Sequence, residues 1–167
     1  MENLNEQVSQ ETITSNFNYE EEKKRKMDQL LLSQNYPFGL IAGIIAGLLG
    51  AVLWAAITVS TEYQIGYMAV AVGLMVGYSI RFAGKGIKPI YGITGAIISL
   101  VSCVLGNIFS LIVFFAGSEN IGYFQALGIV DFASIPAVMI DTFNPMDLLF
   151  YGIAIYEGYK FSIISTE

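Results

Sequence analysis

The stretch FGLIAGIIAGLLGAVLWAAITVS, residues 38–60, decides the fold class because it contains no charged side chain. At a helical rise of about 1.5 Å per residue, the run is long enough to cross a hydrocarbon core of about 30 Å. It follows an acidic and then basic segment, whereas a cleaved signal peptide begins with a short basic region. We therefore predict a transmembrane helix at about 38–60.

The composition of the whole chain is that of a membrane protein. Of 167 residues, 54% are hydrophobic and only 13% are charged, with a mean hydropathy of +0.60. An ordinary soluble domain carries about 25% charged residues, because water must wet its surface. The fold class expected from this composition is an all-α integral membrane protein in contact with the lipid bilayer.

Three further apolar runs predict spans at about 65–82, 90–116 and 146–164. The connection at 61–64 is so short that the first two of the four transmembrane helices must form an antiparallel hairpin. A proline opens the third and the fourth, the position at which proline is best tolerated in a helix. The segment 117–144 mixes apolar and acidic residues, so we expect one or two short interfacial helices there. The transmembrane domain would thus cover 37–165.

Residues 1–36 are predicted to form a cytoplasmic acidic tail and a short charged juxtamembrane helix. The first 18 residues contain three Glu, no Lys or Arg and many small polar residues, and we expect them to be mobile. The three glutamates at 20–22 each precede a basic residue by four positions, which favours ion pairs on a helix. The alternative is a solvated charge run that only marks the cytoplasmic side.

All eight basic residues fall on one side of this topology. They precede the first span, lie between the second and third, or lie near the end of the fourth: Lys23, Lys24, Arg25, Lys26, Arg81, Lys85, Lys88 and Lys160. By the positive-inside rule, this distribution places both termini in the cytoplasm and 117–144 on the outer face.

Two stretches carry a resemblance to known proteins: YQIGYMAVAVGLMVGYSIRFAGKGIKPIYGITGAIISLVSCVLGNIFS at 63–110 and MDLLFYGIAIYEGYKFS at 146–162. Their glycine and aromatic positions resemble a family of small, uncharacterised bacterial multi-pass membrane proteins with four spans. The resemblance covers about 38–164. It implies a bacterial cytoplasmic membrane as the location and implies no activity.

Glycines recur at helical spacing in the predicted spans. The candidate helix-packing glycines are Gly39, Gly43, Gly47, Gly73, Gly77 and Gly106. Such small residues let two helices approach backbone to backbone. We expect them to pack the helices of one chain together, and the alternative is a seam between copies of the chain.

A polar cluster within the membrane is expected from four residues: Arg81, Glu157, Lys160 and Asn107. Glu157 would lie roughly 10 Å inside the inner boundary, where an unpaired carboxylate is unfavourable. Lys160 is three residues away, and Arg81 can extend its long side chain inward. An ion pair that holds the fourth span against the second is favoured over a proton or ion relay. Asn107 must find a partner on another helix, either as structural contact or as part of a binding site.

The residue inventory argues against most catalysis. The chain has no His and a single Cys, Cys103, which removes the imidazole-assisted nucleophiles and leaves only carboxylates as metal ligands. We expect no cofactor, no metal site, no catalytic residue and no nucleic-acid partner. The function expected is that of a small accessory or scaffold subunit that packs with itself or with another membrane protein. The alternative is a minimal transporter or channel with a polar site at Asn107, Glu157 and Arg81.

Overall fold

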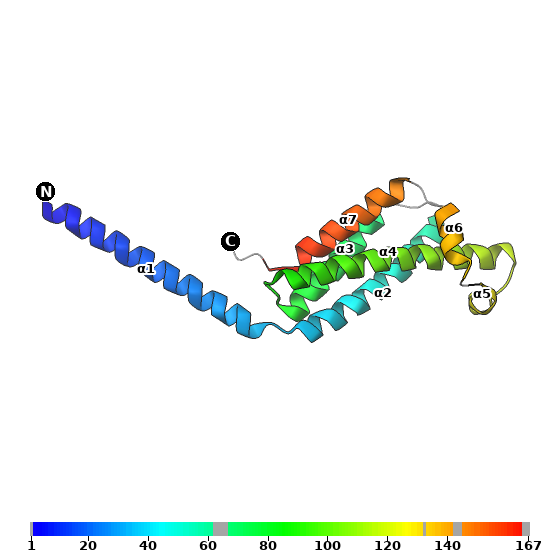
Figure 1. The fold of residues 1–167 in the computed structure, drawn as a ribbon, viewed down its shortest axis with the longest axis horizontal. Coiled ribbons are helices and arrows are strands. Elements are labelled where there is room, and N and C mark those ends of the chain that lie inside the picture. Colours follow the sequence, from blue (N-terminus) through cyan, green and yellow to red (C-terminus); the bar gives the residue numbers. More distant parts are fainter. Residues whose placement is uncertain (1, 62–66, 132, 142–144, 165–167) are drawn as a thin grey trace.

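The computed structural model describes residues 2–61, 67–131, 133–141 and 145–164, and these ranges are almost entirely helical, without a strand. Four helices form a bundle, a fifth projects from it, and two short helices lie at its other end (Figure 1). The helices are α1 (Glu2–Ser33), α2 (Tyr36–Thr61), α3 (Tyr67–Gly84), α4 (Pro89–Ser118), α5 (Tyr123–Ile129), α6 (Ile135–Asp141) and α7 (Pro145–Ser162).

The four bundle helices coincide with the four apolar runs. Each helix boundary lies within two residues of the predicted one, and α4 and α7 begin at the expected prolines, Pro89 and Pro145. Among the described residues, α2, α3 and α4 are long and apolar enough to cross a membrane. α7 has 18 residues but carries Asp147, Glu157 and Lys160, so its composition differs from that of the other three.

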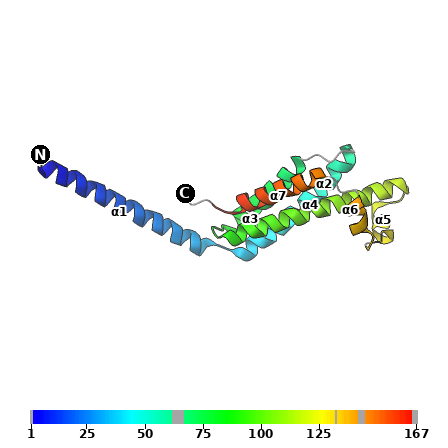
Figure 2. The same cartoon turned by 45° about the horizontal axis from the view of Figure 1, so that its top comes forward.

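Successive bundle helices run in opposite directions. α2 packs against α3 and α4, and α7 packs against α3 and α4 on the other side (Figures 1 and 2). The glycines show the register, because the residue nearest to each one marks the level at which two helices meet. Gly50 of α2 faces Val72 of α3, and Gly73 of α3 faces Glu157 of α7. α2 and α4 are therefore parallel to each other, as are α3 and α7.

Small residues occupy the helix contacts. The six candidate glycines are all buried, and a side chain added at any of them would meet a neighbouring helix of the same chain. At Gly39, an added Cβ would lie 2.9 Å from the Gly84 Cα. At Gly106 it would lie 2.8 Å from the ring of Trp54, which is only 1% exposed. The glycines thus bring helices of one chain into close contact, and the wide hydrophobic core forms around Trp54 and Val72.

One end of the bundle is tied together by backbone hydrogen bonds between segments far apart in the sequence. The Asn35 amide donates to the Gly84 carbonyl, and the Ile164 amide donates to the Gly86 carbonyl, both at 2.9 Å. The Tyr36 and Thr94 hydroxyls share a hydrogen bond of 2.9 Å. The starts of α2 and α4 and the ends of α3 and α7 therefore meet here.

The structure extends the expected charged helix back to Glu2, so that residues 2–18 are helical, and the mobility of this tail stays a prediction. The segment contains neither Gly nor Pro, so nothing interrupts the helix before Ser33, and at 1.5 Å per residue it is about 48 Å long. Of the three expected i,i+4 pairs, Arg25–Glu21 forms, at 3.8 Å. Both side chains are exposed, so the pair adds little stability.

The segment after α4 contains the expected short helices. Asn120, two residues after the end of α4, has a φ of 53°, a left-handed conformation that Asn tolerates, and the chain then turns back. Ala126 of α5 packs against Ile112 and Ala116 of α4, which forms a second, smaller core. The predicted connection at 62–64, the start of the second span at 65–66 and residue 165 lie outside the described residues.

Candidate functional site

A part-buried polar contact between bundle helices joins α4 to α7. The Asn107 amide donates a hydrogen bond of 2.7 Å to the Tyr151 hydroxyl. Asp147 lies one helical turn before Tyr151 on the same face, is 6% exposed and interacts electrostatically with it. Asn107, Tyr151 and Asp147 therefore form a polar cluster in the half of the bundle away from the basic end.

The predicted cluster of Arg81, Glu157 and Lys160 is not assembled. Among the described residues, Glu157 has no ion pair with Arg81 or Lys160. The Lys160 ammonium instead lies over the Tyr156 ring, 5.3 Å from its centre. Asn107 is also far along the bundle from these three, so the four polar residues do not meet in one site.

The reason is the register between α3 and α7. These helices are parallel, with Gly73 against Glu157 and Gly77 against Phe161. Arg81 lies eight residues beyond Gly73, which at 1.5 Å per residue places its backbone about 12 Å beyond the level of Glu157. Arg81 therefore lies at the end of the bundle, whereas Glu157 packs against Gly73 and Gly77 of α3.

All eight basic residues nevertheless lie at one end of the bundle or on the helix that leaves it. Arg81 and Lys160 occupy the last turns of α3 and α7, and the α3–α4 connection carries Lys85 and Lys88. The four remaining basic residues are near the bundle end of α1. This region, which we call the basic end, is also where the backbone hydrogen bonds close the bundle.

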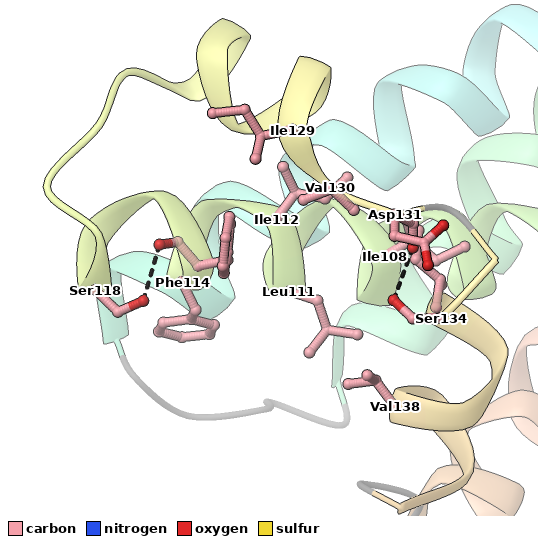
Figure 3. A pocket seen from close by; sticks show the side chains of 12 residues that line it. Ile108, Leu111, Ile112, Phe114, Ser118, Ile129, Val130, Asp131, Ser134 and Val138 are labelled. Carbon is pink, nitrogen blue, oxygen red and sulfur yellow. Dashed lines mark hydrogen bonds between the residues drawn. The ribbon is translucent and has the colours of Figure 1, made fainter.

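A pocket of about 560 Å³ lies at the opposite end, between α4, α5 and α6 (Figure 3). Ile112 of α4 lies beside Val130, and Leu111 faces Val138 of α6. We call it the α4–α5–α6 pocket. Its lining residues are Ile108, Leu111, Ile112, Phe114, Phe115, Ser118, Ile129, Val130, Asp131, Ser134, Ile135 and Val138.

Few polar groups line this pocket, and most of them are bonded locally. The Ser118 hydroxyl donates to the Phe115 carbonyl, and the Ser134 hydroxyl donates to the Asp131 carbonyl, at 2.8 and 2.7 Å. The Asp131 carboxylate accepts the Ala133 amide at 3.0 Å. The pocket can therefore hold an apolar group, with one carboxylate at its wall.

The part of the chain that the structure describes contains no candidate metal-binding group. No group of three His, Cys, Asp or Glu side chains is close enough there to hold an ion. Cys103 is buried against the core around Trp54, with no exposed surface.

Sequence reasoning missed two members of the polar cluster and the pocket. From the sequence alone, Tyr151 fits an interfacial belt or helix packing, and Asp147 fits either the interface or the N-terminus of the fourth span. Their spacing of four residues does place them on one face of α7. That signal was present in the sequence, but nothing in it showed that Asn107 would be opposite.

These features define a class: a helical bundle with three helices apolar and long enough to cross a membrane, as in multi-pass membrane proteins. Comparison of the chain with protein-family profiles, with curated proteins and with solved structures gave no match. The resemblance to small bacterial multi-pass proteins therefore stays a prediction.

Proposed function

We propose that this chain is a four-span membrane protein of the bacterial cytoplasmic membrane, with both termini in the cytoplasm, and that it acts as an accessory or scaffold subunit. The single observation that carries the proposal is the closed interior of the bundle. Gly39 of α2 lies against Gly84 of α3, and Gly95 of α4 lies against Gly158 of α7, so these helix pairs leave no room for a conduit between them toward the basic end.

The polar groups within the bundle support a structural role. Ser102, Ser110 and Ser162 each donate to a carbonyl of their own helix, at 2.7, 2.8 and 2.6 Å. Asn107 donates to the Tyr151 hydroxyl and so joins α4 to α7. A conduit needs polar groups at successive levels of at least two helices, and the separation of Asn107 from Arg81 and Glu157 argues against the transporter alternative.

The outer surface of the bundle supports membrane embedding. The side of α2 away from the bundle carries large apolar side chains that are each about half exposed: Ile41, Ile44, Ile45, Leu48, Leu49, Val52 and Leu53. A continuous apolar surface of this kind is unfavourable in water and suits contact with lipid chains.

A fourth span at α7 agrees with the packing. α7 lies between α3 and α4 and runs parallel to α3. Asp147 is in the first turn of α7, and Lys160 is in its last turn, from which a long side chain can reach the interface. The eight basic residues then lie at one end, which the positive-inside rule assigns to the cytoplasm.

Cysteine accessibility tests the topology. In a Cys103→Ser background, Ser134→Cys should react with an impermeant maleimide added to intact cells, because Ser134 is exposed at the end opposite the basic end. Ser33→Cys, equally exposed but next to the basic end, should react only after the membrane is opened. Reaction of Ser33→Cys in intact cells would overturn the orientation.

Reconstitution separates the scaffold from the transporter. In phospholipid vesicles loaded with an ion-sensitive dye, the chain should leave the permeability to protons, Na⁺ and K⁺ at the level of empty vesicles. If the chain raises the flux above that level and Glu157→Gln abolishes the increase, the chain is a conduit and not a scaffold. Crosslinking in the native membrane should then give a defined product with a second copy or with a larger membrane protein.

A further inference from the structure

The α4–α5–α6 pocket exposes apolar surface that nothing in the described chain covers. Phe114, Ile129 and Val138 line it and are 44%, 60% and 41% exposed. Its volume of about 560 Å³ lies within the range of about 300–1,000 Å³ that is typical of small-molecule sites. The lining calls for an apolar ligand.

The register of the helices places this pocket at the boundary of the apolar belt. Gly106 faces Trp54, which is seven residues before the end of α2. Since α2 and α4 are parallel, Ile108 lies closer to the basic end than the level at which α2 ends, and Ser118 lies beyond that level. The pocket thus spans the level where lipid chains give way to headgroups.

The charge at the pocket wall favours one class of membrane lipid over another. Asp131 is exposed at the pocket wall and has no cationic partner among the described residues. The other charged residues described at this end, Glu119, Asp141 and Asp147, are also acidic, whereas the basic residues are at the opposite end. An anionic headgroup would be repelled, and a headgroup with an ammonium group would be attracted.

We propose that the α4–α5–α6 pocket binds one hydrocarbon chain of a membrane lipid whose headgroup carries an ammonium group, with Asp131 as the charge-recognition residue. This inference rests on the proposed membrane embedding and adds the ligand class. Contact with such a lipid covers the apolar side chains and gives Asp131 a counter-ion.

Two photoreactive lipids provide the test. The full chain is placed in nanodiscs of phosphatidylglycerol that contain, at equal low amounts, either a phosphatidylethanolamine or a phosphatidylglycerol probe with the same diazirine chain. Labelling of 108–138, relative to labelling of the lipid-facing side of α2, should be about two- to fivefold higher with the ethanolamine probe, the ratio expected for one exposed ion pair.

Three variants test which residues cause the difference in labelling between the two probes. Asp131→Asn keeps an oxygen that can accept the Ala133 amide but removes the charge, and should bring the ethanolamine probe down to the glycerol level. Leu111→Trp fills the pocket and should reduce labelling by both probes. Val101→Trp, on an exposed part of α4 outside the pocket, is the matched control and should leave labelling unchanged.

The outcomes separate this inference from the membrane proposal. Equal labelling of the pocket by both probes in the wild type, or a preference that survives Asp131→Asn, overturns the lipid assignment while membrane embedding stands. A chain that fails to enter nanodiscs and stays soluble overturns membrane embedding and the lipid assignment together.

Discussion

Glycine has opposite surroundings at the two ends of the molecule. Toward the basic end, a side chain added at Gly39 would meet the Gly84 backbone, and one added at Gly158 would meet the Gly95 carbonyl oxygen at 2.6 Å. At the other end, an added Cβ on Gly117 or Gly128 would have no neighbouring heavy atom within 4 Å.

The contrast separates a fixed region from an open one. At the basic end, close backbone contacts and interhelical hydrogen bonds hold four helix ends in one register. At the α5–α6 end, small helices pack on α4 through one small core and leave an apolar pocket uncovered. A glycine in an apolar helix therefore indicates close packing only where another helix lies against it.

The largest expected effect comes from filling a closed contact. Gly158→Leu should lower the free energy of unfolding by about 3 kcal/mol or more, the upper part of the overpacking range, because the Gly95 backbone cannot yield as a side chain could. The same change at Gly152, on the same helix but with open space around it, should stay within about 0.5 kcal/mol.

Thermal unfolding in mild detergent, with size-exclusion chromatography to detect aggregation, measures both variants. Equal losses for Gly158→Leu and Gly152→Leu would show that α7 is sensitive to volume everywhere. The contrast between a closed and an open glycine would then be lost.

The helices of the bundle were predictable because each depends on a local property of the sequence. An uncharged run sets the length of α2, and a proline sets the first residue of α4 and α7. The helical state of 2–18 was not predicted, because its polar composition offers no apolar face that would pack against another helix. The lack of Gly and Pro in this segment is compatible with the helix that the structure shows.

The pairing of side chains across the bundle could not be predicted. The spacing of Gly73 and Gly77 indicates that some helix approaches closely, but only the register shows that this helix is α7. An offset of eight residues between Gly73 and Arg81 then separates Arg81 from Glu157. Asn107 was known to need a partner, and Tyr151 emerged only from the same register.

The second prediction concerns this Asn107–Tyr151 contact. Tyr151→Phe removes the hydroxyl that accepts the amide and should cost about 0.6–1 kcal/mol, the usual net value of one such hydrogen bond. Asn107→Leu should cost more, because it removes every polar contact of the amide, and Asn107 makes further interactions besides this one.

Chemical unfolding in detergent, with the double variant included, measures the coupling between the two residues. Additive losses for Tyr151→Phe and Asn107→Leu would show that the hydrogen bond contributes nothing to stability. The polar cluster would then have to be explained by something other than packing of α4 against α7.

The smallest expected effect is the coupling between Arg81 and Glu157. Since the register places their backbones about 12 Å apart along the bundle, Arg81→Met and Glu157→Gln should be additive to within about 0.5 kcal/mol. A favourable coupling well above that value would mean that α7 is displaced along α3 relative to the observed register.

The contact of Glu157 with Gly73 distinguishes the two arrangements, because Gly73→Ala would force the Glu157 Cβ, now 2.8 Å from the added carbon, to move. In the observed register, Gly73→Ala should therefore destabilise the chain even when Arg81 is already Met. In a displaced register, it should have little effect.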